Sequence, residues 1–173
     1  MITERDKSID TRDEFGHWEM DTVYSGKKKS KSCLLVFTER KTRYELIYKM
    51  KSRCADEVVK VLNKMERYYG KNTFRDIFRT ITCDNGIEFS DIDGIMKNDR
   101  TKLFFCHAYT SCERGSNENQ NKLIRRFIKK GMDISKFSNK EINNIEDWIN
   151  TLPRKLFDGK SSYEVLTELR IAL

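Results

Sequence analysis

The sequence is poor in proline and histidine and has no long apolar run. Its 173 residues include one proline, Pro153, and two histidines, and no apolar stretch approaches the ~18–20 residues that would span a bilayer. No repeat and no Pro-, Gly- or Ser-rich linker divides the chain, and no charged-then-apolar leader precedes a small-residue cleavage site. We therefore expect one cytoplasmic domain over residues 1–173 that makes no contact with a membrane.

Cysteine chemistry is also limited. The five cysteines are an odd number, and none belongs to a Cys-x-x-Cys pair. Without a leader, we expect reduced thiols that serve mainly as buried apolar side chains. A structural zinc site is not expected, because four ligands at finger-like spacing are missing.

Charge, by contrast, is abundant. Lys and Arg number 34 and Asp and Glu 27, which gives a net charge of +7. This excess favours a polyanionic partner such as nucleic acid, although a lysine-rich protein without such a partner has the same balance. Aromatic residues make up 11% of the chain and apolar residues recur with regular periods, which is not typical of a disordered protein.

Hydrophobic periodicity divides the chain into strands and helices. Residues 1–15 are highly charged and lack periodicity, so we expect a flexible arm there. Alternation and short apolar runs predict five strands, at residues 17–24, 33–38, 44–50, 79–83 and 103–106. Helical spacing predicts four helices, at residues 55–69, from an N-cap at Ser116 onward, at about 140–150 and at 161–173. This order favours an α/β protein with a ribonuclease H-like fold, a mixed five-stranded sheet with flanking helices.

Three carboxylates stand where surface acids are uncommon. Asp21 lies in the middle of a predicted strand, where aspartate is depleted. Asp84 follows a short predicted strand at a glycine turn, and α/β folds place their chemistry at strand ends. Glu118 lies in the first turn of a predicted helix. Each has an ordinary structural interpretation by itself: a satisfied polar group in a strand, a turn residue, and an acid that complements the helix dipole.

As a set, the three acids point to metal chemistry. An Asp on the first strand, an Asp on the fourth and an acid on a later helix are how ribonuclease H-like enzymes gather carboxylates around two divalent metals. Mg²⁺ prefers carboxylate and water ligands. Two metals ~3.5–4 Å apart clamp the attacking and leaving oxygens of a phosphodiester. The pattern therefore predicts a metal-dependent phosphodiester chemistry.

Three ordered motifs carry a resemblance to a known family. They are GHWEMDTV at residues 16–23, TCDNGIEF at 82–89 and ERGSNENQNKLIRRF at 113–127. Together with FTERKTRYELIYKM at 37–50 and WINTLPRKLFDGKS at 148–161, they resemble bacterial insertion-sequence transposases of the IS-thirty family. The resemblance covers about residues 12–166, and the 33 residues between Asp84 and Glu118 resemble the spacing expected of that family.

The resemblance implies a function and a mechanism. These transposases have an Asp-Asp-Glu catalytic core similar to that of retroviral integrases. The chain is then expected to be a polynucleotidyl transferase that cleaves DNA and transfers strands during transposition. Asp21, Asp84 and Glu118 would be the catalytic residues and would hold two Mg²⁺ or Mn²⁺ ions. Its partners would be the transposon ends and target DNA in the bacterial nucleoid, and the full-length protein would form a homo-oligomer.

The chain also departs from the family's pattern. Proline often stands where this sequence has Ala108 and Lys129, and Cys112 occupies a position where another residue is expected. Family members carry an N-terminal helix-turn-helix region that recognises the ends of the element, and nothing before Arg12 resembles it. We therefore expect an excised catalytic domain or a truncated gene product.

Other acids compete with Glu118 for the third position. Glu88 would have to turn back from the loop after Asp84, and Glu113 precedes the helix. A helical position holds metal geometry more rigidly, which favours Glu118. Glu19 shares a strand face with Asp21 and is a candidate for a group that holds the metal-binding carboxylates in place.

Basic residues near these motifs are candidates for phosphate contacts. Lys122, Arg125 and Lys129 follow Glu118 at helical spacing and form a basic stripe. Arg114 precedes the same helix, and Lys27, Lys28 and Lys29 crowd the first predicted hairpin. The hairpin lysines have the alternative role of keeping a solvated loop soluble. Asn117, Asn119 and Asn121 flank Glu118 and would either orient DNA or water, or cap the helix.

Two other functions remain open on the sequence. One is a catalytically silent DNA-binding or assembly module that keeps the fold, against which the presence of all three acids argues. The other is a ribonuclease H-like nuclease that acts on structured DNA or RNA, which the family motifs make less favoured than transposition.

Overall fold

A five-stranded mixed sheet forms the centre of the computed structural model. The structure describes residues 5–6, 8–26, 29–106, 115–171 and 173, with the backbone alone for residues 8 and 115–118. The strand order is β3-β2-β1-β4-β5. The strands are β1 (His17–Tyr24), β2 (Cys33–Glu39), β3 (Glu45–Met50), β4 (Thr80–Cys83) and β5 (Lys102–Phe105).

The sheet joins an antiparallel half to a parallel half. β1, β2 and β3 form the predicted meander, in which β1 pairs antiparallel with β2 and β2 with β3. β4 lies beside β1 in parallel, and β5 lies beside β4 in parallel. The predicted strands agree with the observed ones to within one residue at each end. β2 is buried along its whole length, as its continuous apolar run predicts for a central strand.

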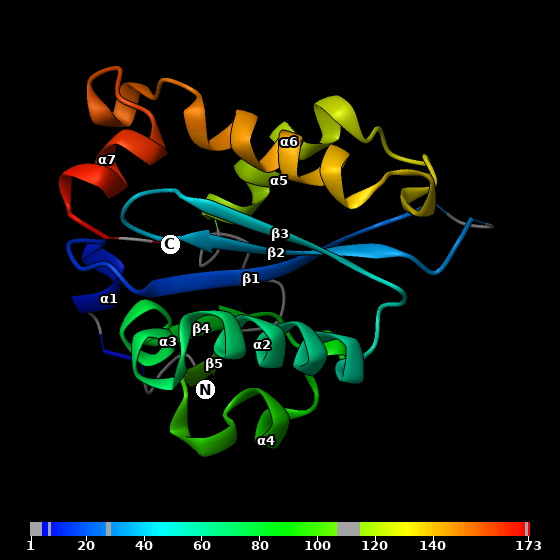
Figure 1. Ribbon diagram of the computed structural model, residues 1–173, viewed down its shortest axis with the longest axis horizontal. Coiled ribbons are helices and arrows are strands. Elements are labelled where there is room, and N and C mark those ends of the chain that lie inside the picture. The colour runs from blue at the N-terminus through cyan, green and yellow to red at the C-terminus, as the bar shows by residue number, and fades with distance from the viewer. Residues whose placement is uncertain (1–4, 7, 27–28, 107–114, 172) are drawn as a thin grey trace.

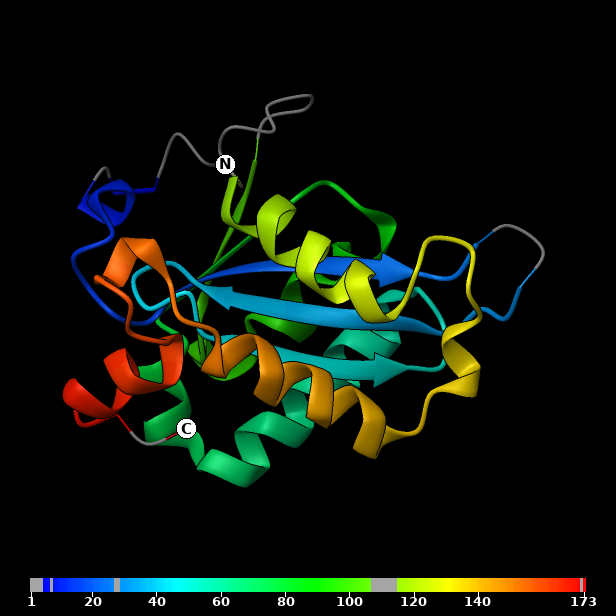
Figure 2. The ribbon, with the colours of Figure 1, turned by 90° about the horizontal axis from the view of Figure 1, so that it is seen from above.

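Helices cover both faces of the sheet (Figure 1). α5 and α6 lie on one face, and α2, α3 and α4 lie on the other. Figure 2 shows α5 and α6 running side by side across the sheet, with α7 beyond one end of α6. The helices are α1 (Ser8–Thr11), α2 (Ala55–Tyr69), α3 (Lys71–Ile77), α4 (Ile92–Ile95), α5 (Gly115–Phe127), α6 (Asn139–Thr151) and α7 (Ser162–Glu168). Short 3-10 helices occur at η2 (Ile87–Phe89), η3 (Lys97–Asp99), η5 (Ile134–Lys136) and η6 (Lys155–Phe157).

Alternation along β1 divides the core into two layers. Trp18 and Met20 point to the α2 side and join a cluster that includes Leu62 of α2 and Phe78. Val23 points to the α5 side and joins a second cluster around Ile124 and Ile128. The Trp18 indole N–H donates to the carbonyl of Ile77 at 2.7 Å, so the one polar atom of this buried ring is satisfied.

Three features differ from the prediction at the ends of helices. The short helix α3 was not predicted. Gly70, with φ of 82°, ends α2, and α3 begins at the next residue. α5 begins at Gly115, so Ser116 lies within the helix. The last helix ends at Glu168 rather than at residue 173, because Arg170 adopts the left-handed conformation with φ of 56°.

The N-terminal segment contacts the domain where it is described. We expected a flexible arm over residues 1–15, but α1 forms there and the side chains of Arg5 and Ile9 are only 8% and 7% exposed. Among the described residues of this charged stretch, Ile9 is the only buried apolar side chain, which is too little for a periodicity signal.

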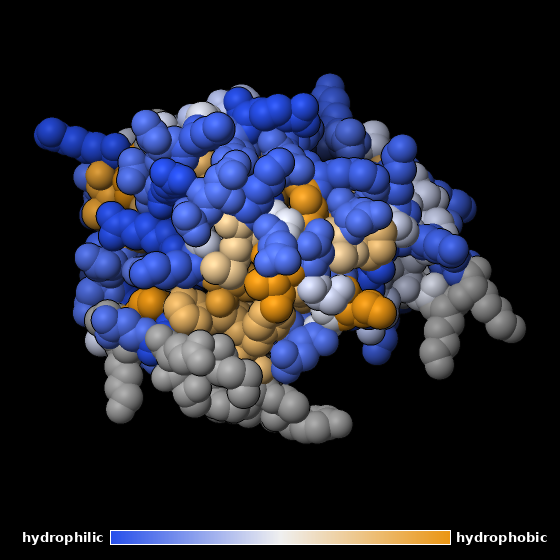
Figure 3. All heavy atoms as spheres, turned by 90° about the horizontal axis from the view of Figure 1, so that it is seen from below, coloured by the Kyte–Doolittle hydropathy of each residue, from blue (hydrophilic) through white to orange (hydrophobic). Residues whose placement is uncertain are grey.

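The surface of the α2–α4 side is mostly hydrophilic, with apolar area gathered toward its middle (Figure 3). Ile87 of η2 and Ile92 of α4 are 77% and 47% exposed. Among the described residues, no helix has both the length and the apolar content that crossing a membrane requires.

The packing of the core on the α2 side of the sheet can be tested by a substitution at Phe78. Its ring is fully buried and stacks on Trp18 and Phe74 at centroid distances of 4.8 and 4.6 Å. We expect Phe78→Ala to lower the free energy of unfolding by about 3–5 kcal/mol, because the removed ring leaves a cavity that its neighbours only partly fill. Urea denaturation measures this. Ile87→Ala, at an exposed position, is the control and should change the free energy of unfolding by less than about 0.5 kcal/mol. Equal effects of the two variants would contradict the packing around Phe78.

Candidate active site

The parallel pairing of β1 and β4 brings the two predicted aspartates together. Glu19 of β1 pairs with Thr82 of β4, and the same register continued by two residues sets Asp21 beside Asp84. Neighbouring strands lie about 4.8 Å apart, and paired residues point to the same face. Both aspartates are partly exposed, and Asp21 lies on the face that α5 packs against. Sixty-two intervening residues separate them in sequence, and Asp84 directly follows the strand that pairs with the strand of Asp21.

Asp21 is held by two hydrogen bonds. The backbone N–H of Thr22 donates to its Oδ1 at 2.8 Å, and the side-chain amide of Asn121 donates to its Oδ2 at 2.8 Å. Asn121 belongs to α5, which packs against β1. The amide therefore fixes the carboxylate and also attaches the helix to the strand.

The backbone of Glu118 lies one helical turn before Asn121. Residues three apart share a face of a helix, so the backbone position of Glu118 lies on the same face of α5 as the residue that contacts Asp21. The side chain of Glu118 lies outside the described residues, as do Glu113 and Arg114. Its role as the third acid stays a prediction.

Asp84 begins a tight turn after β4. The backbone N–H of Gly86 donates to Asp84 Oδ1 at 3.0 Å, and the Asn85 side chain donates to the Cys106 carbonyl at 3.1 Å. A Cβ on Gly86 would lie 2.9 Å from Asp84 Oδ1 and 2.6 Å from Glu88 Oε2. A side chain at this position would therefore displace one or both carboxylates from the places they occupy here.

Glu88 is the acid that competes with Glu118 in sequence, and the structure gives it other partners. Thr22 Oγ1 donates to its Oε1 at 2.7 Å, and Arg53 Nε donates to the same oxygen at 2.6 Å. Burial acts to raise the Glu88 pKa, but the bonds from Arg53 and Thr22 outweigh it and hold the pKa below its usual value. Glu88 is thus an ionised, paired carboxylate beneath the Asp84 turn. Its Oε2 is buried and accepts no hydrogen bond from the described residues.

A buried ionic network supports β1 next to the aspartates. Glu19, two residues before Asp21 on the same face, is completely buried and accepts a bond from Arg40 Nη1 at 2.8 Å. Arg40 also pairs with Asp10 at 3.1 Å, and Arg5 bonds both Asp10 and, at 3.0 Å, Thr82 Oγ1. Glu19 thus bonds Arg40, and its expected support of Asp21 stays a prediction. No pattern in the sequence pointed to Arg5 or Arg40.

The chemistry of this donor set suits a hard divalent cation. Asp21 and Asp84 offer carboxylate oxygens from rigid neighbouring backbones, and the Asp84 turn has a glycine where a side chain would obstruct it. Among the residues whose side chains are described, no three His, Cys, Asp or Glu groups converge on one metal position. The two aspartates supply the type of oxygen ligand that such a cation prefers.

The predicted DNA-contact residues separate into three groups. Lys122, Lys129 and Lys29 are exposed, as a phosphate-contacting lysine requires. Arg125 is half-buried and donates to the carbonyl of Tyr24 at 3.1 Å, so it ties α5 to the end of β1. Lys27, Lys28 and Arg114 lie outside the described residues.

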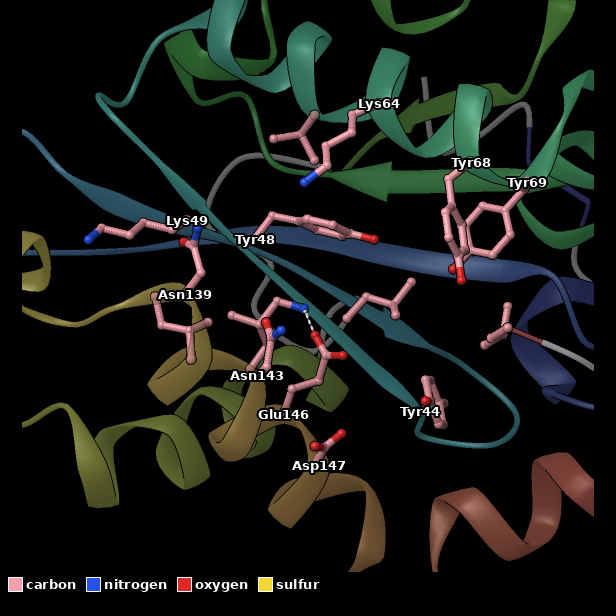
Figure 4. A pocket seen from close by; sticks show the side chains of 15 residues that line it. Tyr44, Tyr48, Lys49, Lys64, Tyr68, Tyr69, Asn139, Asn143, Glu146 and Asp147 are labelled. Atoms are coloured by element: carbon pink, nitrogen blue, oxygen red, sulfur yellow. Dashed lines mark hydrogen bonds between the residues drawn. The ribbon is translucent and has the colours of Figure 1, made fainter.

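A separate cavity of about 460 Å³ lies along β3, the edge strand (Figure 4). Four tyrosines line it together with Glu146 of α6. Glu146 accepts a hydrogen bond from the backbone N–H of Ile47 on β3. This contact covers part of the strand edge, which would otherwise present unpaired backbone groups. Burial raises the Glu146 pKa to about 7.

Comparisons with known proteins agree on one family. The family model described as "Integrase core domain" matches residues 12–111. A probable transposase for the insertion-like sequence element IS1161 of Streptococcus salivarius is 36% identical over 97% of this chain and 46% of its own length. The transposase InsI for element IS30A of Escherichia coli K12 is 30% identical over 95% of this chain and 41% of its own length. The chain thus spans less than half the length of these relatives.

Solved structures with the same fold include retroviral integrases. The catalytic core domain of BIV integrase has a TM-score of 0.64 and 15% identity, covering 91% of this chain and 97% of that one. A chain of the simian T-cell lymphotropic virus intasome in complex with the PP2A regulatory subunit B56γ has a TM-score of 0.65 and 15% identity, covering 86% and 52%. These likenesses confirm the predicted ribonuclease H-like fold, and the transposase relatives confirm the predicted resemblance.

Removing the Glu19 charge should destabilise the domain. Glu19→Gln leaves the buried Arg40 guanidinium with only the partly exposed Asp10 carboxylate, so we expect a loss of roughly 3 kcal/mol in the free energy of unfolding. Urea denaturation at neutral pH measures it. Glu14→Gln is the matched control, because the Glu14 side chain is 71% exposed and its pairs should contribute less than about 1 kcal/mol. A Glu19→Gln protein as stable as this control would show that the network is not needed.

Glu146 should make stability depend on pH. Its pKa is about 7 in the folded protein, above the ordinary glutamate value, so the folded state holds a proton that the unfolded state releases. Stability should therefore fall as pH rises from about 4.5 to about 7. In Glu146→Gln this fall should be shallower, and Tm measured at several pH values across the window gives the comparison. A Glu168→Gln control at an exposed position should follow the wild type. Parallel curves for all three proteins would refute a raised pKa at Glu146.

Proposed function

The chain belongs to the integrase core domain family, and from this we propose that it is the catalytic core of a DNA transposase that cleaves DNA and transfers strands during transposition of an insertion sequence. The observation that carries the proposal is the placement of Asp21 on β1 and of Asp84 directly after β4, the parallel strand beside β1, together with the packing of α5, the helix that contains Glu118, against β1. The partners would be transposon ends and target DNA in the bacterial nucleoid. Because two ends must be brought together, the full-length protein would act as a homo-oligomer.

The acids would hold two Mg²⁺ or Mn²⁺ ions. Asp21 and Asp84 would contact the first, and Glu118 with one of the aspartates the second. Bound in this way, divalent ions stabilise the charge that develops on a phosphodiester during displacement and assist the ionisation of an attacking hydroxyl. This distribution of ligands rests on the family resemblance together with the placement of the two aspartates.

The protein's own groups would position the carboxylates for this chemistry. The Thr22 N–H and the Asn121 amide each bond one oxygen of Asp21, which fixes the plane of the carboxylate while leaving lone pairs for a cation. The Gly86 N–H does the same for one oxygen of Asp84. No serine or tyrosine nucleophile is required, because water and then a DNA 3′ hydroxyl would be the attacking groups. The reaction would be an in-line displacement at phosphorus without a covalent protein intermediate.

Neutralising any one of the three acids should abolish the chemistry. Asp21→Asn, Asp84→Asn and Glu118→Gln should each reduce Mn²⁺-dependent cleavage of DNA by at least about 10²-fold, since loss of a metal ligand should cost more than the 10–100-fold typical of outer contacts. Calorimetric titration with Mn²⁺ should show weaker binding in the same variants. Asp93→Asn, an identical substitution at an exposed position in α4, is the control for both measurements.

The outcomes separate the alternatives. Product formation by Asp84→Asn at the wild-type rate would overturn the assignment. Metal-independent DNA binding without product at any protein concentration would indicate a catalytically silent module. Faster cleavage of an RNA–DNA hybrid than of duplex DNA would indicate a ribonuclease H-like nuclease instead.

A further inference from the structure

A second group of basic side chains surrounds a pocket beside the start of α5. The pocket has a volume of about 550 Å³. Four of its seven lining residues are cationic, and two others are amides from α5. The lining residues are Arg12, Arg43, Arg154, Lys155, Asn119, Gln120 and Leu156.

Segments that are distant in sequence build this pocket. Arg12 precedes β1, Arg43 lies in the turn between β2 and β3, and Lys155 begins η6 after α6. Figure 2 shows the N-terminal segment, the β2–β3 turn and the segment after α6 on one side of the molecule, next to the start of α5. No single stretch of sequence contains the group, so it carries no motif.

Hydrogen bonds hold the wall of the pocket in place. Gln120 Nε2 donates to the Arg43 carbonyl at 2.9 Å, and Arg154 Nη1 donates to Gln120 Oε1 at 3.3 Å. Arg154 Nη2 also donates to the Ile149 carbonyl at 3.3 Å. The acceptors around Arg154 are neutral, so these bonds orient its guanidinium without cancelling its charge.

Three of the four cationic side chains of the pocket have no ion pair among the described residues. Within the part of the chain that the structure describes, no carboxylate forms an ion pair with Arg12, Arg154 or Lys155. Glu45 is the acid that acts on Arg154 through space. Burial raises the Glu45 pKa to about 8, so this carboxyl group is mostly protonated at neutral pH.

Crowding of like charges accompanies this arrangement. Burial, followed by the nearby charge of Arg12, lowers the Arg43 pKa to about 10, although Glu19 and Glu39 act in the opposite direction. Arg12 and Arg43 both have left-handed backbones, with φ of 63° and 59°, which a residue with a Cβ rarely adopts. Strained backbones of this kind persist where the surroundings impose them, and they concentrate at binding sites.

We propose that this pocket binds a backbone phosphate of the DNA substrate, a few nucleotides from the phosphate that reacts at Asp21 and Asp84. The proposal rests on the proposed function, because it assumes that DNA lies along α5. Asn119 and Gln120 directly follow Glu118, so the pocket and the predicted catalytic position share one helical turn. Arginine forks match the oxygens of a phosphate, and the two amides could complete the contact. The pocket would extend the DNA path beyond the stripe of Lys122 and Lys129 toward the start of α5.

The salt dependence of DNA binding tests the proposal. The measurement is fluorescence anisotropy with a short fluorescein-labelled duplex between 50 and 200 mM salt, the range over which phosphate contacts dominate. EDTA is present, so that no metal-dependent chemistry occurs. We expect Arg12→Gln/Lys155→Gln to weaken binding and to reduce the slope of log K against log salt by about 1, as loss of one phosphate contact predicts. The charge-preserving Arg12→Lys/Lys155→Arg protein should keep the wild-type slope, and thermal melting checks that each variant is folded.

A matched pair of lysines controls for net charge. Lys71→Gln/Lys97→Gln removes the same charge from exposed positions on the α2–α4 side of the sheet, and it should leave the slope unchanged. An unchanged slope in the pocket variant, or an equal decrease in the control, would overturn the proposal. Asp84→Asn, assayed in parallel for cleavage, keeps the two hypotheses apart. If it still forms product, the catalytic assignment fails whatever the slopes show, whereas a failed slope test with inactive Asp84→Asn refutes the pocket alone.

Discussion

The candidate site depends on one constraint, the parallel pairing of β1 with β4. Side chains alternate along a strand, so a shift of one residue in this pairing would send Asp84 to the opposite face from Asp21. The observed register is fixed from both sides: Trp18 and Ile81 are buried together in the core under α2, while Glu19 and Thr82 face the buried arginines. The aspartates are neighbours because the hydrophobic core and the ionic network agree on the same register.

Helix α5 is the second part on which the site relies, and it is anchored by polar contacts on several sides. Asn121 bonds Asp21, Gln120 bonds the β2–β3 turn, and Arg125 bonds the carbonyl that ends β1. Ile124 and Ile128 supply the apolar contact with the sheet. Because these contacts converge on β1 and the adjacent turn, the helix has little freedom to slide along the strand, and the backbone of Glu118 is positioned relative to the aspartates.

Charge is distributed in a way that suits a polyanionic substrate. Buried acids are either paired with arginine, as in Glu19 and Glu88, or have pKa values raised by burial, as in Glu45 and Glu146. Lys122 and Lys129 of α5 are exposed, and the basic side chains around the pocket are partly or fully exposed. Positive charge therefore lies near α5, where it would draw a phosphate backbone toward the helix.

The strands and the main helices could be predicted from the sequence alone, and the two candidate aspartates could be selected from it. Alternation in HWEMDTVY and the apolar run CLLVFT depend only on which side chains must be buried, and the structure agrees with both. The aspartates stood out because a carboxylate is costly in a strand and useful at the end of one. Contacts between distant segments, which no local pattern predicts, bring Asn121 to Asp21, Arg53 to Glu88 and Arg40 to Glu19. The basic pocket at Arg43 and Arg154 could likewise not be predicted, because its residues come from segments that are distant in sequence and meet only in the fold.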